Sequence, residues 1–452
     1  MKNFILQNKL IFICIILLSI WYIDVWENAN TCSRVLPIAA YLDQENFVLD
    51  NYKDKTIDIS YINNHYYMDK APLPTLIVLP FAIVAKHLNI IQQQDNSFYS
   101  TSLYLLGDII CGVIPFLLII FYVIQSLVKH NKEKYILMGI SSVFGSFLFV
   151  YSGTFFAHTL SAALILSAYL QYKKENFSAT GLLLGAAFLS EYTTIWFLIS
   201  WMLILFFKQK SFHKVSKLLF GFLPALLFIF WYNFHFTGNP FTMLYLYVAD
   251  NFETIHKSTY GLSFPKLKSL FGLLFSNNRG LLLYAPVLLY GLFLVSVENK
   301  NAKLKHYAKY FIHPVILPFA LILLFISSHT AWEGGWSYGP RHLYSPAVLL
   351  LFATISHKNF GSFNYIFWLF ASYGLVCAFL AKLTVLYSIP ELNENILPYL
   401  ISKLKDGYNA GNAYTLYTQK SALTGFFLFI YLYLLLALLC IKKNYLLSNS
   451  KS

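Results

Sequence analysis

The chain has 452 residues, of which 58% are hydrophobic and 12% are charged, and its mean hydropathy is +0.57. A soluble domain carries roughly 25% charged residues, so this composition excludes a water-soluble globular protein. The net charge of +13 would suit a nucleic-acid binder, but the lysines lie in short segments between apolar runs, which is the topology signal of a membrane protein. We therefore predict an all-α polytopic membrane protein without a nucleic-acid partner, because in lipid the backbone must be hydrogen-bonded within helices.

Apolar runs long enough, or nearly long enough, to span a bilayer recur along the chain. Because about 20 residues suffice for one span, the run 179–207 is too long for a single untilted helix, and the polar segment 190–194 divides it in two. The pattern then predicts about twelve spans in a single membrane domain covering residues 1–452, with no separate soluble domain. The runs are 10–26, 100–128, 134–151, 155–172, 179–207, 215–236, 281–297, 309–328, 343–356, 363–386 and 421–441.

The stretch 73–90 is also apolar, and its assignment decides the topology. If it crossed the membrane, the basic segment 129–134 would lie on the same side as residues 27–72. If it only dips into the membrane or lies along it, that basic segment is cytoplasmic, as the positive-inside rule requires. We therefore expect a first extracytoplasmic loop at 27–99 that contains a membrane-dipping segment at 73–90, and we expect both termini in the cytoplasm.

The expected cytoplasmic segments are short and basic, and the outer ones are longer and richer in acids. The cytoplasmic segments, which include 300–309, contain most of the basic residues but only three acids, Glu133, Glu175 and Glu298. Any chemistry is therefore expected on the outer face. The outer segments are 27–99, the break near 190, 237–280, 329–342 and 387–420.

The first outer loop has the richest set of reactive side chains. Carboxylates can act as general bases on a hydroxyl, and arginine and lysine hold phosphate through charge-assisted hydrogen bonds. Asp69-Lys70 immediately precedes the proline-punctuated apolar stretch, which places a cation at the depth of a lipid phosphate. For the remaining residues, the alternative is that a long exposed loop is simply polar. The set is Glu27, Arg34, Asp50, Asp54, Asp58, His65, Tyr67, Asp69 and Lys70.

The outer loop 332–342 is the second candidate. Its tryptophans Trp332 and Trp336 suit the aromatic belt at a membrane surface, but a belt does not explain three glycines, a proline, an arginine and a histidine in eleven residues. Glycines allow the backbone to approach a ligand closely, and aromatic side chains offer flat faces for sugar rings. Arg341 can hold a phosphate, and His342 lies beside it.

Four further ionisable residues lie within or beside apolar stretches. A charge inside such a stretch is costly and tends to be functional, which applies to Glu191, although pairing with Arg341 would be a structural alternative. His158 can serve in capping, interface packing or catalysis, and Asp108 suits a hydrogen bond between helices. Arg279 can contact a phosphate or anchor its segment at the membrane interface.

Several kinds of site are not expected. The five cysteines, Cys14, Cys32, Cys111, Cys377 and Cys440, contain no CxxC pair, so neither a disulfide framework nor a zinc site is predicted. The chain has no Walker A, GxSxG or HExxH sequence and no DxD pair in an outer loop. We therefore expect no metal and no cofactor.

Several of these segments resemble the GT-C class of membrane glycosyltransferases, which includes protein O-mannosyltransferases and lipid A aminoarabinose transferases. At the level of architecture the likeness covers most of the chain, and it is sharpest for a bacterial branch of the class. The segments that carry it are Ser33-Arg34, His65 to Pro72, Ser190 to Tyr192, Arg279 to Leu282 and Trp332 to Arg341.

The resemblance implies a GT-C-like bundle in a bacterial inner membrane. Such an enzyme takes a sugar from a polyprenyl-phosphate carrier and transfers it, with inversion, to a hydroxyl of an acceptor glycan, lipid or protein. Lys70 matches the family lysine that contacts the donor phosphate, and Arg341 and Arg34 are expected to join it. The residues expected to bind substrate are Tyr67, Glu191, Trp332, Trp336 and His342.

One departure from the family pattern concerns the general base. The family places an acidic residue about three positions before the arginine of the first loop, whereas this chain has Thr31, preceded by Asn30. The candidates for the base are therefore Glu27, Asp69 and Asp58.

Two alternatives to an enzyme remain open. A lipid or glycan transporter or flippase is the alternative from another class. Transporters often show inverted repeats and polar groups at the bilayer midplane, whereas the ionisable residues here gather at one face. A non-catalytic relative of the GT-C class is the second alternative, and it is suggested by Asn30-Thr31.

Overall fold

The computed structural model describes residues 2–24, 27–248, 261–298, 312–392, 394–419 and 421–449. These residues form helices joined by loops, with one two-stranded hairpin, which confirms the all-α prediction. Residues 25–26 and 309–311 of the predicted spans, and the basic segment 300–309, lie outside the described residues. The strands are β1 (Ile59–Ile62) and β2 (His65–Met68), and the helices are α1 (Lys2–Gln7), α2 (Lys9–Ile20), α3 (Ala29–Gln44), α4 (Leu73–His87), α5 (Thr101–Gly107), α6 (Ile114–Lys129), α7 (Ile136–Phe144), α8 (Phe147–Val150), α9 (Ala157–Lys173), α10 (Phe177–Ser190), α11 (Ile195–Leu203), α12 (Phe212–Thr237), α14 (Leu267–Phe275), α15 (Leu281–Tyr284), α16 (Val287–Glu298), α18 (Ile316–Ser327), α19 (Tyr344–Ser356), α20 (Asn364–Leu383), α21 (Ile396–Lys405), α22 (Ala413–Thr418) and α23 (Ala422–Asn449).

Among the described residues, 4 helical segments are long and apolar enough to cross a membrane. Shorter apolar helices of 10–17 residues accompany them, and these are shorter than the roughly 20 residues that a span needs. The prediction of about twelve spans was therefore too high. The long segments are Thr101–Lys129, Phe212–Thr237, Asn364–Leu383 and Ala422–Tyr445.

The overestimate arose because several continuous apolar runs are not continuous helices. The run 134–151 is divided between α7 and α8 at Gly145, where the backbone carbonyl oxygen would lie only 2.0 Å from a Cβ built on Gly374 of α20. The run 281–297 is divided between α15 and α16, where Pro286 follows the end of α15. The break expected in the run 179–207 is present, since α10 ends at Ser190.

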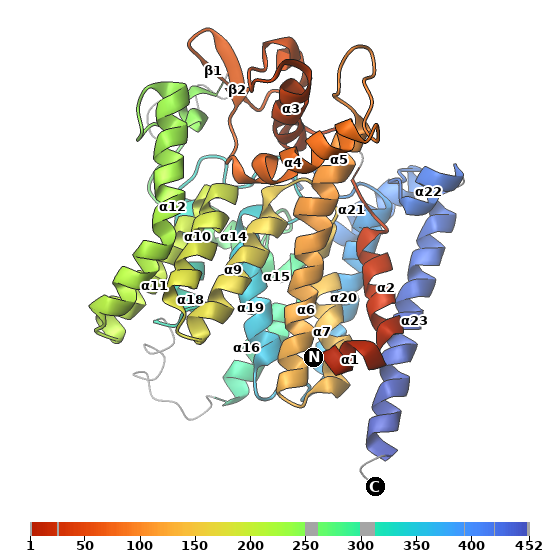
Figure 1. The fold of residues 1–452 in the computed structure, drawn as a ribbon. Helices are drawn as coiled ribbons and strands as arrows, with labels where there is room; N and C mark the ends of the chain where they lie inside the picture. The colour runs from red at the N-terminus through yellow and green to blue at the C-terminus, as the bar shows by residue number, and fades with distance from the viewer. Residues whose placement is uncertain are drawn as a thin grey trace.

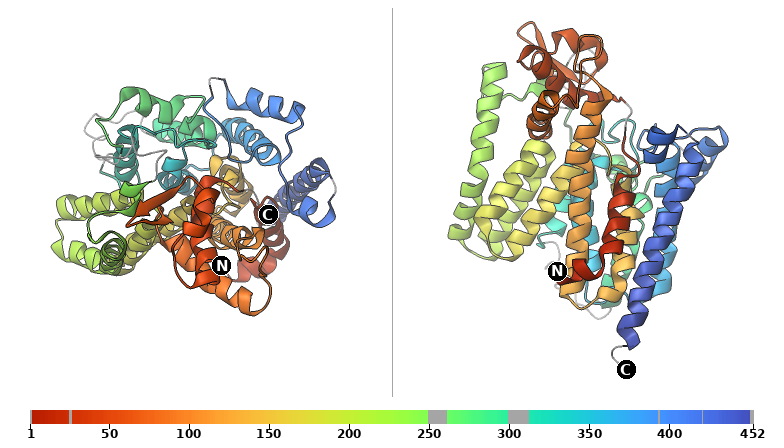
Figure 2. Two further views of the ribbon diagram at one scale, coloured as in Figure 1. Left: turned by 90° about the horizontal axis from the view of Figure 1, so that it is seen from above. Right: turned by 45° about the vertical axis from the view of Figure 1, so that its right-hand side comes forward.

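The longer helices run roughly alongside one another, and α3, the hairpin and α4 lie across one end of them (Figure 1). We call residues 29–87 the cap. Helix α1 and the last turns of α23 lie at the opposite end (Figure 1). Helices α21 to α23 lie to one side of the cap rather than beneath it (Figure 2).

The cap packs around an apolar core that it shares with residues after it in the chain. Every residue of α3 from Thr31 to Ala40 is buried, so the alternative of a simply polar exposed loop does not hold for this stretch. The side chain of Asn28 caps the helix by accepting hydrogen bonds from the backbone N–H groups of Asn30 and Thr31. The apolar core is formed mainly by residues between 32 and 111, including Val35, Leu36, Ile38, Val78, Ala82 and Leu103.

The hairpin fixes which residues of the cap lie opposite one another. Strands β1 and β2 pair antiparallel, with Ile59 opposite Met68. The turn residues Asn63 and Asn64 have φ of 51° and 68°, which asparagine tolerates better than most residues. The side chain of Ser60 donates a hydrogen bond of 2.7 Å to the carbonyl of Leu244, so the hairpin is joined to the segment that follows α12.

Candidate functional site

The ammonium group of Lys70 lies between two carboxylates at the base of the hairpin. Its Nζ atom is 2.9 Å from Oδ2 of Asp58 and 2.8 Å from Oδ2 of Asp69. Asp58 directly precedes β1 and Asp69 directly follows β2, so the antiparallel pairing of Ile59 with Met68 places the two acids side by side. The three side chains are largely buried, with exposures of 15%, 17% and 2% for Lys70, Asp58 and Asp69.

The first turns of α3 form the next layer of this cluster. The hydroxyl of Ser33 donates a hydrogen bond of 3.0 Å to Oδ1 of Asp69. Arg34 is buried, and its Nη1 group donates to the carbonyl and the side-chain oxygen of Asn30. Asn30 thus orients Arg34. The Nε atom of Arg34 has no hydrogen-bond partner among the described residues.

The two carboxyl groups differ in their pKa. Burial alone would raise the pKa of Asp58, but the positive charges of Lys70, Arg341 and Arg34 hold it below its ordinary value. Burial raises the pKa of Asp69 above its ordinary value, against the attraction of Lys70 and with the help of the neighbouring Asp58 carboxylate. Burial would lower the pKa of Lys70, but the two carboxylates raise it. Lys70 is therefore charged, and Asp69 is the more basic of the two acids.

Glu191 lies beside this cluster and is bonded to a different partner from the one expected. Its Oε1 atom is 3.1 Å from Nδ1 of His158, and its Oε2 atom accepts a hydrogen bond of 2.8 Å from Ser161. Pairing with Arg341 was the structural alternative, and the close contact of this carboxylate is instead with His158. Glu191 also interacts electrostatically with Arg34.

The loop 332–342 is held in place by Arg279, which is fully buried. Its Nε and Nη2 groups donate hydrogen bonds of 2.8 Å and 2.6 Å to the carbonyls of Glu333 and Gly335. Its Nη1 group donates to the carbonyl and the side chain of Asn278. Through these bonds Arg279 fixes the position of the loop that contains Arg341.

Arg341 approaches the loop backbone closely. A Cβ atom on Gly334 would lie 2.9 Å from Nε of Arg341 and 2.9 Å from Nε2 of His342, so only glycine fits there. The Nε atom of Arg341 is buried and, within the described ranges, has no hydrogen-bond partner. Burial and the neighbouring Arg341 lower the pKa of His342 well below its ordinary value, so His342 adds no positive charge. Its ring centroid lies 6.3 Å from that of His158.

An apolar cavity of about 240 Å³ opens beside the hairpin. Tyr67, a predicted substrate-binding residue, lines it and contacts Phe236 with 4.9 Å between ring centroids. The cavity begins next to the charged cluster, because the lining residue Met68 precedes Asp69 in the chain. The other lining residues are Pro37, Phe47, Pro72, Thr75, Leu76, Phe228, Trp231, Tyr232 and His235.

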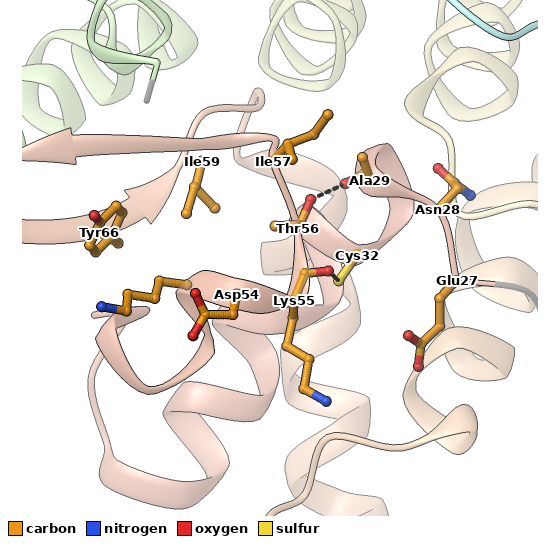
Figure 3. A pocket seen from close by; sticks show the side chains of 11 residues that line it. Glu27, Asn28, Ala29, Cys32, Asp54, Lys55, Thr56, Ile57, Ile59 and Tyr66 are labelled. Atoms are coloured by element: carbon orange, nitrogen blue, oxygen red, sulfur yellow. Dashed lines mark hydrogen bonds between the residues drawn. The ribbon is translucent and has the colours of Figure 1, made fainter. Parts of the chain in front are cut away.

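Three predicted site residues lie elsewhere. Trp332 packs against α14, where a Cβ on Gly272 would lie 2.4 Å from its ring, and Trp336 is 68% exposed. Glu27 lines a separate polar pocket of about 620 Å³ on the cap, shown in Figure 3. The lining of that pocket includes neither Asp69 nor Lys70.

Sequence reasoning missed some members of the cluster. Tyr245, in the segment after α12, interacts electrostatically with Lys70, Asp69 and Asp58. Ser33 was noted only as part of the family resemblance, and its bond to Asp69 required the helical fold of α3. No group of three or more histidine, cysteine, aspartate or glutamate side chains suited to a metal ion occurs in the described part of the chain.

Comparison with protein-family models finds no matching family, and comparison with curated proteins finds no match.

Proposed function

We propose that this protein transfers a sugar from a polyprenyl-phosphate carrier to an acceptor hydroxyl, and that the cluster around Lys70 holds the donor phosphate. The observation that carries this proposal is the combination of three cations, Lys70, Arg34 and Arg341, with only two carboxylates, Asp58 and Asp69. A third carboxylate nearby, Glu191, is engaged with His158. The cluster therefore suits an additional anion.

Two buried hydrogen-bond donors without a partner among the described residues also favour an anionic ligand. The Nε groups of Arg34 and Arg341 are buried without a hydrogen-bond partner among the described residues, and an unmatched buried donor is costly. A phosphate group offers several strong acceptor oxygens, and its bonds to arginine and lysine are charge-assisted. Cations that are already in place would also stabilise the negative charge that develops on the phosphate as the sugar leaves.

The apolar cavity beside the cluster suits the lipid part of the same molecule. Its lining comes from α4, α12, β2 and α3, and it includes Phe228 and Trp231 of the long helix α12. A phosphate bound near Lys70 would allow the first isoprene units to lie against Tyr67 and these aromatic side chains. A small soluble phosphate donor would leave this apolar surface uncovered, so the cavity favours a lipid carrier.

Asp69 is the general base that the electrostatics favour. A base is most effective when its pKa lies near the working pH, and the pKa of Asp69 is raised whereas that of Asp58 is lowered. In the proposed step, the acceptor oxygen forms a bond to C1 of the sugar and gives its proton to Asp69. The bond between C1 and the phosphate oxygen breaks, and its electron pair stays on the phosphate beside Lys70.

We further propose that the cap faces the extracytoplasmic side. The opposite end of the bundle, where α1 and the last turns of α23 lie, then faces the cytoplasm. The short basic segments support this orientation. In this arrangement the shorter apolar helices complete a polytopic bundle of the GT-C kind around the long ones.

The proposal is tested by transfer of a radiolabelled sugar from polyprenyl phosphate with the purified protein in lipid nanodiscs. Replacing Lys70 by alanine should lower transfer by about 100-fold or more, as expected when a preorganised charge is removed. Lys405→Ala is the matched control, because Lys405 is exposed at the end of α21, and it should keep wild-type activity.

A transporter predicts a different result in the same preparation. Reconstituted into liposomes, it would move labelled polyprenyl-phosphate sugar between leaflets without changing any bond. Lipid movement without transfer in the wild type, or equal transfer by wild type and Lys70→Ala, would contradict the proposed reaction.

A further inference from the structure

The polar pocket of about 620 Å³ on the cap is separate from the lipid-facing cavity. Its volume lies within the range of about 300–1,000 Å³ that is typical of small-molecule sites. Glu27 and Lys55 extend into it from two different segments of the chain, as Figure 3 shows, and Asp54 lies nearby. The pocket is therefore a defined concavity with reactive side chains.

The pocket shares two walls with the Lys70 cluster. In the segment 54–58, residues 54–57 line the pocket, while the next residue, Asp58, bonds to Lys70. In helix α3, Cys32 lines the pocket, while the next residue, Ser33, bonds to Asp69. A ligand in the pocket would therefore be separated from the cluster only by the thickness of one chain segment and the first turns of one helix.

The pocket is lined by two carboxylates and two ammonium groups, so their charges sum to zero. Among the described residues, the side chains of Glu27 and Asp54 form no hydrogen bond or ion pair, while Lys53 interacts electrostatically with Asp50. Lys55 is held only over the ring of Tyr99, at 5.4 Å from the ring centroid. Two carboxylates and two ammonium groups thus face an open space with no net charge.

The zero net charge of the pocket favours a neutral ligand that has many hydroxyl groups. A phosphate-rich or nucleic-acid ligand would call for an excess of positive charge, and a lipid tail would call for an apolar lining. A hydroxyl group both donates and accepts hydrogen bonds, so carboxylates and ammonium groups together suit a ligand with many hydroxyls. Tyr66, which is partly exposed and also lines the pocket, offers an aromatic surface for the C–H face of a sugar ring.

We propose that this pocket binds the acceptor of the reaction, and that the acceptor is a net-neutral carbohydrate whose hydroxyls bond to Glu27 and Lys55. The identification as an acceptor rests on the proposed transferase function. The binding of carbohydrate does not, because it follows from the pocket alone. The pocket would hold a part of the acceptor away from its reacting hydroxyl, and that hydroxyl would have to extend past the segment 54–58 to reach Asp69.

The binding test uses saturation-transfer NMR on the purified full-length protein, with lactose as the neutral probe. Lactose should receive saturation from the wild-type protein, and Glu27→Gln and Lys55→Gln should weaken its binding by about 10-fold, which corresponds to about 1.4 kcal/mol. Lys405→Gln, at a residue outside the pocket lining, should bind lactose like the wild type. Size-exclusion chromatography identifies any variant that fails to fold.

The outcomes separate the two proposals. If lactose receives no saturation from the wild type, or binds equally to the pocket variants, the carbohydrate pocket is overturned. If lactose binds as expected but no sugar is transferred from polyprenyl phosphate, the transferase function fails and the pocket remains as a carbohydrate site. If both hold, Lys55→Gln should raise the KM for lactose about 10-fold and leave the KM for the donor unchanged.

Discussion

At the residue scale, the two carboxylates beside Lys70 play unequal roles because they are unequally buried. Asp69 is 3% exposed, and it accepts a hydrogen bond from Ser33 as well as the ion pair with Lys70. Asp58 is less buried and lies within the field of three cations. In the proposed reaction, Asp69 would therefore accept the proton, and Asp58 would hold Lys70 in place.

This inequality predicts how the reaction depends on pH. Because the pKa of Asp69 is raised, transfer should be lost on acidification at a pH above the ordinary carboxyl value of about 3.9. Asp58→Asn removes the negative charge that helps to raise this pKa, so the acid limb of log kcat/KM against pH should move to lower pH. Asp50→Asn is the control, since Asp50 pairs with His65 outside the cluster, and it should leave the limb in place. A limb that moves to higher pH in Asp58→Asn would rule out Asp69 as the base.

The residue types of the cluster were predictable, but most of their contacts were not. Lys70, Asp69 and Asp58 were identified from composition and position in the first loop, and the hairpin register then explains why they meet. Nothing in the spacing of the sequence indicated that Glu191 pairs with His158, because that contact joins residues 33 positions apart on different helices. Glu27 was a candidate base because it lies about one helical turn before Thr31, and the fold places it in another pocket.

At the scale of elements, the loop 332–342 positions Arg341 through its backbone shape rather than through side-chain bonds. Arg279 fixes the loop by its carbonyls, and Gly334 allows it to pass beside the guanidinium. Gly334 and Gly335 both have positive φ, of 74° and 64°. They differ in their surroundings, because a Cβ on Gly335 would meet nothing within 4 Å.

The two glycines therefore provide a matched pair of variants. Gly335→Ala should cost only the backbone strain of a positive φ, about 1–2 kcal/mol in thermal unfolding. Gly334→Ala should add a clash with Arg341 and His342, and should lower transfer by a further 10-fold or more at a temperature where both variants are folded. Transfer assays and thermal unfolding of the two purified variants decide this. Equal activities would show that the position of Arg341 does not depend on Gly334.

Helix breaks and the cap explain why the sequence predicted the elements only in part. Apolar runs mark where helices occur, but they do not show that a helix stops at Gly145 or before Pro286. Helix α3 escaped prediction because its buried face includes Thr31, Ser33 and Arg34, which look like loop residues. These residues are buried only because α3 packs against the rest of the cap and the ends of the long helices, and those contacts cannot be read from the sequence of α3.

At the scale of the whole molecule, the site lies at one end of the bundle, opposite α1 and the last turns of α23 (Figure 1). The helices α10 and α12 pack closely enough that a Cβ on Gly181 would lie 2.0 Å from the carbonyl oxygen of Leu218. Small residues at such crossings are typical of helices that associate in lipid. The C-terminal end of α12 lies beside the hairpin, to which the following segment is joined through Ser60 and Leu244.

The proposed orientation predicts opposite labelling of the two ends of the bundle. All five native cysteines are buried, so they should give little background with a membrane-impermeant maleimide. In sealed cells, Trp336→Cys should be labelled because Trp336 is 68% exposed at the loop that contains Arg341. Gln209→Cys, exposed between α11 and α12, should be labelled only after the cells are opened. The reverse pattern would invert the topology.

The core of the cap is local in sequence, since its buried residues lie almost entirely between 32 and 111. During synthesis the N-terminal part of a chain generally folds first, so the cap can take shape while most of the bundle is still unmade. Arg341 emerges from the ribosome long after Lys70. The proposed phosphate site is thus complete only after about three quarters of the chain has been made, and a chain truncated before Arg341 would lack one of its three cations.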